Sequence, residues 1–309
     1  MNIVFMGTPD FAVPALEALY KSKHNIAGVF SQPDKPVGRK QVLTPPPVKA
    51  FAVQNGLSVY QPNSLKNDDS YELIKKLNPD IIIVAAYGKI LPKNILDFPE
   101  YGCVNIHASL LPKYRGAAPI QWAVINGDKK TGITIMKMAE GLDTGDMILV
   151  DKTEIGENET SAELFDRLAE QGAVSLLKAL DMLENGSVEF TSQDDALSTY
   201  AVKITKALSP IDWSKSASEV HNLVRGLQTW PCASTIIDGK EFKIHKTVLS
   251  LKTGNKPGEI VDNKGVLTVC CGDGCCVDVL EIQPQGKKKM DIKSFFAGNK
   301  LELGTVIGE

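Results

Sequence analysis

Apolar residues form short runs along the first two thirds of the chain, and most of these runs predict buried strands. Residues 2–6 and 80–86 are almost continuously apolar, which is typical of the central strands of a parallel sheet. A longer segment, residues 160–185, carries apolar side chains at helical spacing. Strands that alternate with helices indicate an α/β fold, so we expect a Rossmann-like, mostly parallel sheet in a first domain at residues 1–190.

The pattern changes after residue 208, where short alternating segments follow one another. The segments that predict strands are residues 233–237, 241–249, 258–261, 267–271, 276–283 and 303–306. Turn sequences separate some of them, at Asp238-Gly239 and Gly272-Asp273-Gly274. Five or six short strands fit a small β-barrel of the OB type, a fold that often binds oligonucleotides. We therefore expect a second domain at residues 209–309, joined to the first by a linker at 191–208.

The stretch Gly102–Pro119, which reads GCVNIHASLLPKYRGAAP, is the main candidate for chemistry. Its Asn105 and His107 are two positions apart in a short predicted strand, so both side chains point to the same face. Prolines and glycines follow, which places the pair at the carboxyl end of the strand, where open α/β sheets bind ligands. An amide N–H and an imidazole that converge there can polarise a carbonyl oxygen. The alternative is structural: Asn105 fixes the turn and His107 is a hydrogen-bonded core residue.

The composition is that of a globular protein, with 43% hydrophobic residues, 23% charged residues and a net charge of −3. This charge argues against a generally basic nucleic-acid binder but leaves room for local basic patches. No apolar run reaches the roughly 18 residues of a membrane span, and the N-terminus reads as a strand instead of a signal peptide. We therefore expect a cytoplasmic protein. A monomer is also expected, because no heptad repeat or long exposed apolar helix indicates a partner chain.

Four of the six cysteines fall in the segment VCCGDGCC, residues 269–276. Adjacent cysteines on either side of Gly-Asp-Gly predict the two strands of a hairpin, with one cysteine of each pair facing inward. The C-x2-C spacing of zinc sites is absent, so small apolar packing is favoured over a structural metal.

The run NIHASLLPKYRGAAP, residues 105–119, resembles the signature of the folate-dependent formyltransferases, in which Asn-x-His is followed by a Ser-Leu-Leu-Pro loop. Its form HASLLP-x-[YW]-RGAAP is similar to the branch of the family that acts on methionyl-tRNA. The segment GTPDFAVPAL, residues 7–16, also resembles that branch. The resemblance implies transfer of the formyl group of 10-formyltetrahydrofolate to the α-amino group of initiator methionyl-tRNA, without a metal.

A third catalytic residue follows from the same resemblance. The segment GLDTGD, residues 141–146, is identified as the family loop that supplies it, and the matching position is Asp143. Asn105, His107 and Asp143 are then the expected catalytic residues, with Asn105 donating to the formyl oxygen. The residues alone favour the alternative that Asp143 and Asp146 are turn residues that bond their own backbone.

Three segments are expected to border the folate-binding pocket. The resemblance assigns this role to the loop after the Asn-x-His motif, to the turn YGKILP after residues 80–86, and to the start of the GLDTGD loop. The residues concerned are Ser109, Leu110, Leu111 and Pro112, then Ala86, Tyr87, Gly88, Ile90 and Leu91, and finally Gly141 and Leu142. A plain strand-to-helix turn is the alternative for the YGKILP segment.

Residues 32–49, QPDKPVGRKQVLTPPPVK, are too long and too rich in proline for a simple connection between a strand and a helix. Their basic side chains predict either a solvated loop or an arm that meets phosphates. The resemblance favours the arm, because family members insert a loop here that binds the tRNA acceptor stem. The expected tRNA-binding residues are Lys35, Arg39, Lys40 and Lys49, and a second contact at Lys287, Lys288 and Lys289. Arg39 is the preferred member, since a guanidinium suits bidentate phosphate contact.

Three alternatives compete with this hypothesis. A folate-dependent formyltransferase that acts on a small amine, such as a purine precursor or an amino sugar, would share the same catalytic residues. An RNA-binding relative without activity would have lost one of them, whereas all are present in this sequence. An NAD-dependent enzyme would need the G-x-G-x-x-G fingerprint, which the first strand-to-helix turn, Gly7-Thr8-Pro9, lacks.

Overall fold

The computed structural model of the chain describes residues 1–38 and 40–308. Two compact units form, and each is discontinuous in sequence. Unit 1 contains residues 1–116, 131–153 and 165–200; unit 2 contains residues 117–130, 154–164 and the chain from residue 201 onward. The functional division predicted from the sequence, with domains at 1–190 and 209–309, stays a prediction.

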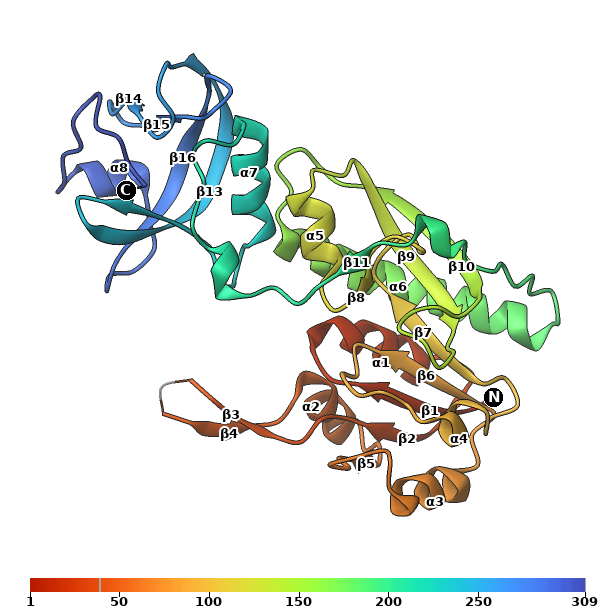
Figure 1. Ribbon diagram of the computed structural model, residues 1–309. Coiled ribbons are helices and arrows are strands. Elements are labelled where there is room, and N and C mark those ends of the chain that lie inside the picture. The colour runs from red at the N-terminus through yellow and green to blue at the C-terminus, as the bar shows by residue number, and fades with distance from the viewer. Residues whose placement is uncertain (39, 309) are drawn as a thin grey trace. The chain divides into compact units, whose positions relative to one another are not determined.

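The main sheet of unit 1 has seven strands in the order β10-β9-β7-β6-β1-β2-β5 (Figure 1). Their bounds are β1 Asn2–Gly7, β2 Asn25–Phe30, β5 Val59–Tyr60, β6 Ile81–Ala85, β7 Cys103–His107, β9 Lys130–Lys137 and β10 Met147–Glu154. β1 pairs in parallel with β2 and β6, β6 with β7, and β2 with β5, while β9 runs antiparallel to β7. The predicted Rossmann-like, mostly parallel sheet is therefore confirmed.

Helices connect these strands. They are η1 Asp10–Ala12, α1 Val13–Tyr20, α2 Pro47–Gln54, α3 Asp68–Leu77, α4 Lys93–Leu96, α6 Ser161–Glu184 and η2 Asp195–Leu197. The long helix α6 begins with a capping box, because Thr160 Oγ1 accepts from Glu163 N at 3.3 Å and Glu163 Oε2 accepts from Thr160 N at 2.8 Å. Its apolar stripe is buried, as the helical spacing of the sequence predicts.

Part of the basic, proline-rich segment forms a hairpin. β3 Lys35–Val37 and β4 Val42–Thr44 pair in antiparallel fashion, with Lys35 opposite Thr44. Every described residue of the two strands is exposed, so no alternation of apolar and polar side chains marks them in the sequence. For this reason the sequence predicted a loop here, whereas the structure has two strands that pair with each other.

Unit 2 contains an antiparallel sheet in the order β12-β13-β16-β15-β14, with β17 paired to β16. The bounds are β12 Ala233–Ile237, β13 Lys240–Thr253, β14 Ile260–Asp262, β15 Leu267–Cys270, β16 Cys275–Pro284 and β17 Met290–Asp291. The helices of this unit are α5 Pro119–Ile125, η3 Lys206–Leu208, α7 Ala217–Gly226 and α8 Ile292–Phe296. Residues 303–306, expected as a strand, contribute one bridge between Val306 and Glu259.

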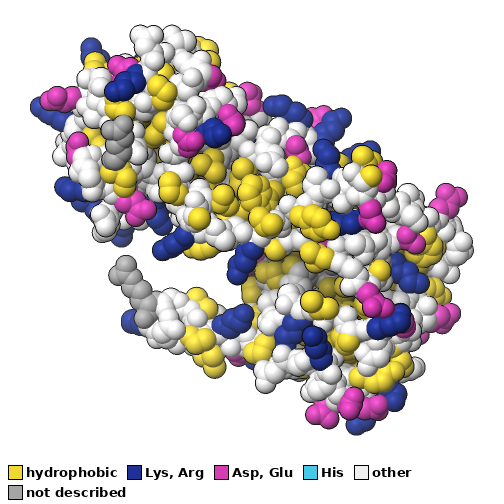
Figure 2. Space-filling view, in the orientation of Figure 1, with side chains coloured by type: hydrophobic (Ala, Val, Ile, Leu, Met, Phe, Trp, Pro, Cys, Tyr) yellow, Lys and Arg dark blue, Asp and Glu magenta, His cyan; other side chains and the backbone are white. Residues whose placement is uncertain are grey.

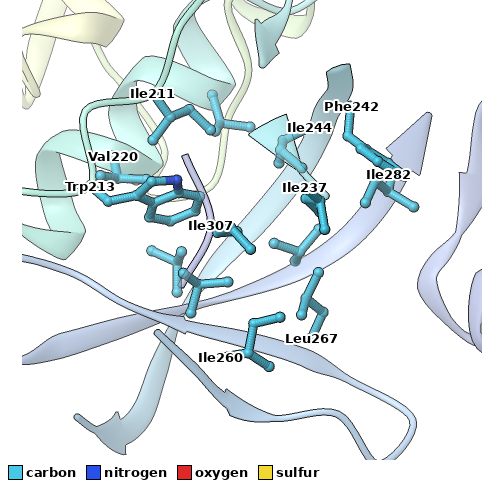
Figure 3. Packing of buried hydrophobic residues seen from close by; sticks show 14 of the residues in the cluster. Ile211, Trp213, Val220, Ile237, Phe242, Ile244, Ile260, Leu267, Ile282 and Ile307 are labelled. Carbon is cyan, nitrogen blue, oxygen red and sulfur yellow. The ribbon is translucent and has the colours of Figure 1, made fainter. Parts of the chain in front are cut away.

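One hydrophobic core lies within the strands of unit 2. Ile260, Leu267 and Ile282 from the sheet gather with Trp213 and Ile307 around a common centre (Figure 3). Trp213 is almost fully buried, and its indole Nε1 donates to Thr235 Oγ1 at 3.0 Å, so its polar atom is satisfied. The antiparallel C-terminal β domain expected from the alternating segments is therefore present.

Two further short strands, β8 Arg115–Gly116 and β11 Tyr200–Ala201, pair with each other. The backbone N–H of Arg115 donates to Thr199 O at 2.8 Å, and Tyr114 N donates to Thr199 Oγ1 at 2.9 Å. The segment around Thr199 thus fixes the chain that follows the Asn-x-His motif.

Candidate active site

Strand β7 ends in the two polar residues whose spacing places them on one face. β7 pairs with β6 on one side and with β9 on the other, so the backbone at its end is held along both edges. The side chain of His107 is 6% exposed, whereas Asn105 is only partly buried. Asn105 therefore has an accessible amide, and His107 is almost fully enclosed.

The imidazole of His107 lies between a carbonyl oxygen and a carboxylate. Its Nε2 is 2.9 Å from Tyr114 O, and its Nδ1 is 3.7 Å from Asp143 Oδ2. A carbonyl oxygen can only accept, so Nε2 carries a hydrogen and donates it to Tyr114 O. Nδ1 is left to face the Asp143 carboxylate, at a distance longer than a hydrogen bond.

Asp143 reaches this pair from the loop between β9 and β10. Its Oδ2 accepts from Gly116 N at 2.8 Å, and its Oδ1 lies 3.5 Å from Asn105 Nδ2. The φ angle of Asp143 is +52°, in the left-handed region that Asp enters more readily than most other residues. Gly145 can only be glycine, because a Cβ there would lie 1.6 Å from Lys137 O. The structure thus brings Asn105, His107 and Asp143 together from two segments.

A polar residue that the sequence did not single out, Gln193, contacts the same loop, and a second, Arg115, contacts Gln193. Gln193 Nε2 donates to Asp143 O and to Gly145 O, at 2.8 Å each. Gln193 Oε1 in turn accepts from the buried guanidinium of Arg115. Gln193 is 50 residues from Asp143 in sequence and belongs to no recognisable motif, so one sequence carries no signal for it. The sequence contained Arg115 in the loop after the Asn-x-His motif but gave no separate role to it.

Two hydrogen bonds, one within the Ser-Leu-Leu-Pro loop and one from β9, hold the loop in place. Ser109 Oγ donates to Lys113 O at 2.6 Å, and Thr134 Oγ1 on β9 donates to Ser109 O at 2.7 Å. The Leu111–Pro112 peptide is cis. Ser109 and Leu111 are buried, whereas Leu110 and Pro112 are partly exposed. Leu110 and Pro112 are therefore the members of this predicted set with surface available to a ligand.

The two other predicted folate-binding segments contain exposed apolar side chains. Ile90 is 78% exposed and Leu142 is 59% exposed. Ala86, Gly88 and Gly141 are exposed, and Tyr87 and Leu91 are buried. An ion pair of 3.2 Å between Lys93 Nζ and Glu140 Oε1 joins the turn after β6 to the loop that carries Asp143. Burial raises the pKa of Tyr87 to about 12, which keeps its hydroxyl protonated.

The β3–β4 hairpin presents basic and apolar side chains together (Figure 2). Lys35 and Lys40 are exposed, and Arg39 lies outside the described residues. Lys49 is engaged elsewhere: its Nζ contacts both oxygens of Asp34 at 2.8 Å and Gln61 Oε1 at 2.8 Å. These contacts lower the pKa of Asp34, with the Lys49 hydrogen bond as the largest cause. Lys49 therefore anchors the base of the hairpin, while Lys35 and Lys40 point to solvent.

The lysines predicted as a second contact lie in the turn after β16 and just beyond it. Lys287 and Lys288 are exposed. Lys289 Nζ forms an ion pair with Glu281 Oε2 at 2.8 Å, and both side chains are partly exposed to solvent. Lys287 and Lys288 are thus the members of this group that have no ion pair with another described residue.

The cysteine-rich hairpin lies in the sheet of unit 2. Cys270, Cys271 and Cys276 are buried, and Cys275 is exposed. Within residues 1–38 and 40–308, no cluster of three or more His, Cys, Asp or Glu residues is arranged to hold a metal ion. No helix in this part of the chain is long and apolar enough to cross a membrane.

Comparison with known families and sequences gives matches over nearly the whole chain. Residues 1–180 match the family described as formyl transferase, and residues 203–300 match the formyl transferase C-terminal domain. The methionyl-tRNA formyltransferase of Alkaliphilus oremlandii (strain OhILAs) is 49% identical, with all of both chains covered. That of Clostridium novyi (strain NT) is 48% identical over 99% of this chain and all of its own.

Solved structures with the same fold include two N-formyltransferases, one of them a sugar formyltransferase. A sugar 3N-formyl transferase, solved with dTDP and 5-N-formyl-THF, has a TM-score of 0.68 at 21% identity, covering 93% of this chain and 98% of its own. An N-formyltransferase from Helicobacter canadensis, in complex with folinic acid and dTDP-3-aminofucose, has a TM-score of 0.68 at 19% identity, covering 92% and 99%. At such low identity the likeness concerns the fold.

Proposed function

The chain belongs to the formyl transferase family, and from this we propose that it transfers the formyl group of 10-formyltetrahydrofolate to the α-amino group of initiator methionyl-tRNA. Two full-length relatives that are 48–49% identical carry the name methionyl-tRNA formyltransferase. The single observation that carries the proposal is the meeting of Asn105, His107 and Asp143 at the end of β7.

Asn105 has the role of an oxyanion donor. When an amine attacks the formyl carbon, negative charge grows on the formyl oxygen, and a fixed N–H aimed at this oxygen stabilises the transition state. The Asn105 amide is partly exposed, and its contact to Asp143 Oδ1 is long, at 3.5 Å. An N–H of Asn105 can therefore donate to a bound formyl oxygen without giving up a strong hydrogen bond.

His107 and Asp143 handle the proton that the attacking amine must lose. Asp143 accepts this proton, directly or through water, and His107 Nδ1 faces the same carboxylate at 3.7 Å. The proton then passes to the folate nitrogen that leaves, so the charge of the protein is unchanged after one turnover. Tyr114 O keeps the imidazole in one orientation through the whole step. No covalent enzyme intermediate is needed, since neither Asn105 nor His107 acts as a nucleophile.

The residues present fit the folate donor, which supplies an already activated formyl group. Ile90 and Leu142 are exposed aliphatic side chains on two loops that the Lys93–Glu140 ion pair joins. Such a pair of apolar side chains gains by covering a flat aromatic ring, because apolar surface is removed from water on both partners. Asn105 lies at the end of β7, adjacent to the strand that precedes the Ile90 turn.

The exposed lysines of the β3–β4 hairpin favour the proposal that the acceptor is a polyanion such as tRNA. Lys35 and Lys40 have no ion pair with another described residue, so phosphate groups can approach them without displacing a partner. Lys49 holds the base of the hairpin through Asp34, which fixes where the arm leaves the sheet. We assign Lys35 and Lys40 to the tRNA backbone, and Arg39 remains a sequence-based candidate for the same role.

One assay tests the proposal. Purified protein is given 10-formyltetrahydrofolate with charged initiator methionyl-tRNA, glycinamide ribonucleotide or a dTDP-linked amino sugar as the acceptor. We expect kcat/KM for methionyl-tRNA to exceed that for either small amine by about 100-fold or more, because a site built for one acceptor loses several kcal/mol with another. A small amine that reacts faster than methionyl-tRNA would overturn the proposal.

A further inference from the structure

Gln193 uses its whole side-chain amide inside unit 1. Its two N–H groups donate to Asp143 O and Gly145 O at 2.8 Å each. Its oxygen accepts from Arg115 Nε at 3.1 Å and from Arg115 Nη2 at 2.8 Å. An amide offers two donors and two acceptor positions, so Gln193 is fully hydrogen-bonded.

Arg115 decides which way the Gln193 amide points. A guanidinium only donates, so the oxygen of Gln193 must face it and the NH₂ group must face the Asp143 loop. Arg115 is itself buried, with 2% of its surface exposed, and Nη2 also contacts Asp195 Oδ1 at 2.7 Å. A buried guanidinium is costly to leave unpaired, which keeps both Gln193 and Asp195 in place.

The same short segment, residues 114–116, contacts two members of the catalytic group, His107 and Asp143. Tyr114 O orients His107, and Gly116 N holds the carboxylate of Asp143. Arg115 lies between them and reaches the backbone of Asp143 through Gln193. Residues 114–116 therefore hold both parts of Asp143: the side chain directly, through Gly116 N, and the main chain through Gln193.

Asp143 needs support of its main chain. Its φ of +52° lies in the sparsely populated left-handed region, so the loop keeps it only where neighbours enforce it. Gly141 and Leu142 just before it are exposed. The far end of the loop is tied by Lys137 N to Asp146 O at 2.9 Å. The two Gln193 hydrogen bonds hold the part in between.

We propose that Gln193 is a positioning residue of the reaction, which aims the Asp143 carboxylate at Asn105 and His107 by clamping the carbonyls of Asp143 and Gly145. The inference rests on the proposed function, because Asp143 has its chemical role only there.

The test uses Gln193→Glu in the full-length protein. The glutamate keeps the length of the side chain and still accepts from Arg115, but it presents only acceptors to the two carbonyls. Gln193→Leu is the second variant and removes both sets of hydrogen bonds without adding charge. Gln171→Glu is the matched control, since Gln171 is equally half-buried and donates to one carbonyl, Asp151 O, at 3.1 Å.

We expect Gln193→Glu and Gln193→Leu to lower kcat by about 10- to 100-fold with each KM within about twofold of wild type, as for a misplaced catalytic group. Hydrogen exchange of the amides at residues 141–146 should be faster in both variants. Gln171→Glu should leave kcat and this exchange unchanged. Wild-type kcat with wild-type exchange in the Gln193 variants would overturn the inference. Losses of kcat and of melting temperature equal to those of Gln171→Glu would overturn it too.

The outcome is separable from that of the proposed function. If wild-type protein formylates a small amine and leaves methionyl-tRNA untouched, the proposed acceptor is wrong, and the kcat comparison is made with the amine that reacts. The exchange measurement needs no acceptor at all. Unchanged exchange at residues 141–146 therefore counts against Gln193 whichever acceptor the enzyme uses.

Discussion

The end of β7 and the β3–β4 hairpin belong to the same unit but differ in the burial and pairing of their polar side chains. At β7 the imidazole of His107 is 6% exposed and contacts a carbonyl, with a carboxylate nearby. On the hairpin Lys35 and Lys40 point to solvent, and neither has an ion pair with another described residue. One region has its polar groups fixed before a ligand arrives, and the other keeps its charges available.

The difference follows from what each region has to do. Groups that stabilise a transition state must be in place beforehand, because reorganising them during the reaction would cost part of the gain. Phosphate contacts work from solvated lysines, since most of their free energy comes from the release of counterions. Substitutions at β7 should therefore change kcat, and substitutions on the hairpin should change the apparent affinity for tRNA and its dependence on salt.

The largest effect is expected for Asp143→Asn. The asparagine can still accept from Gly116 N but no longer takes a proton, so kcat should fall by about 10²- to 10⁴-fold. Asp146→Asn is the control, because Asp146 lies in the same loop and its side chain is exposed. Steady-state kinetics at saturating concentrations of both substrates measure the effect. If Asp146→Asn lowered kcat as much as Asp143→Asn, the specific role of the Asp143 carboxylate would be refuted.

Asn105→Ala comes next. Loss of one oxyanion donor should lower kcat by about 10²- to 10³-fold, with KM for the folate changed little. The partly buried site leaves room for the smaller side chain, so the melting temperature should stay close to that of wild type. A variant that keeps wild-type kcat would take Asn105 out of the reaction.

A double substitution on the hairpin, Lys35→Ala with Lys40→Ala, should have a smaller effect of a different kind. We expect kcat/KM for tRNA to fall by about tenfold at low salt and the slope of log(kcat/KM) against log[salt] to become flatter by up to about 2. KM for the folate should not move. Lys66→Ala with Lys76→Ala, two exposed lysines on the same unit, is the control. An equal change in both pairs would reflect net charge alone.

The smallest effects are expected after β16. Lys287→Ala with Lys288→Ala should raise KM for tRNA by about two- to threefold, as for peripheral phosphate contacts.

Lys289→Ala removes a partly exposed ion pair with Glu281 and should cost less than about 1 kcal/mol of unfolding free energy. Titration of tRNA binding and denaturant unfolding measure the two effects. A loss of tRNA affinity larger than that of the hairpin variant would reverse the ranking of the two basic regions.

Much of the fold could be predicted because burial leaves a pattern. The apolar runs at residues 2–6 and 80–86 became β1 and β6, and the capping box at Thr160 opens α6. The hairpin left no such pattern, since its strands pair with each other and all their residues in the described part of the chain are exposed. A sheet that covers no core cannot be found from hydrophobic periodicity.

The site divides in the same way. The spacing of Asn105 and His107 predicts a shared face, because the side chains of a strand alternate. Asp143 was predicted only from the family resemblance. Gln193 was predicted neither from residue spacing nor from the resemblance, because its partners are backbone carbonyls of a loop 50 residues away.

The roles assigned to β7 and to the hairpin are separated by the single-turnover rate of formyl transfer in complexes saturated with both 10-formyltetrahydrofolate and methionyl-tRNA. We predict that Asn105→Ala stays about 10²- to 10³-fold slower than wild type under these conditions. The Lys35→Ala, Lys40→Ala variant should return to the wild-type rate, because saturation compensates for weaker binding. A wild-type rate for Asn105→Ala, with a slow rate for the hairpin variant, would show that the chemical step depends on the hairpin and not on Asn105.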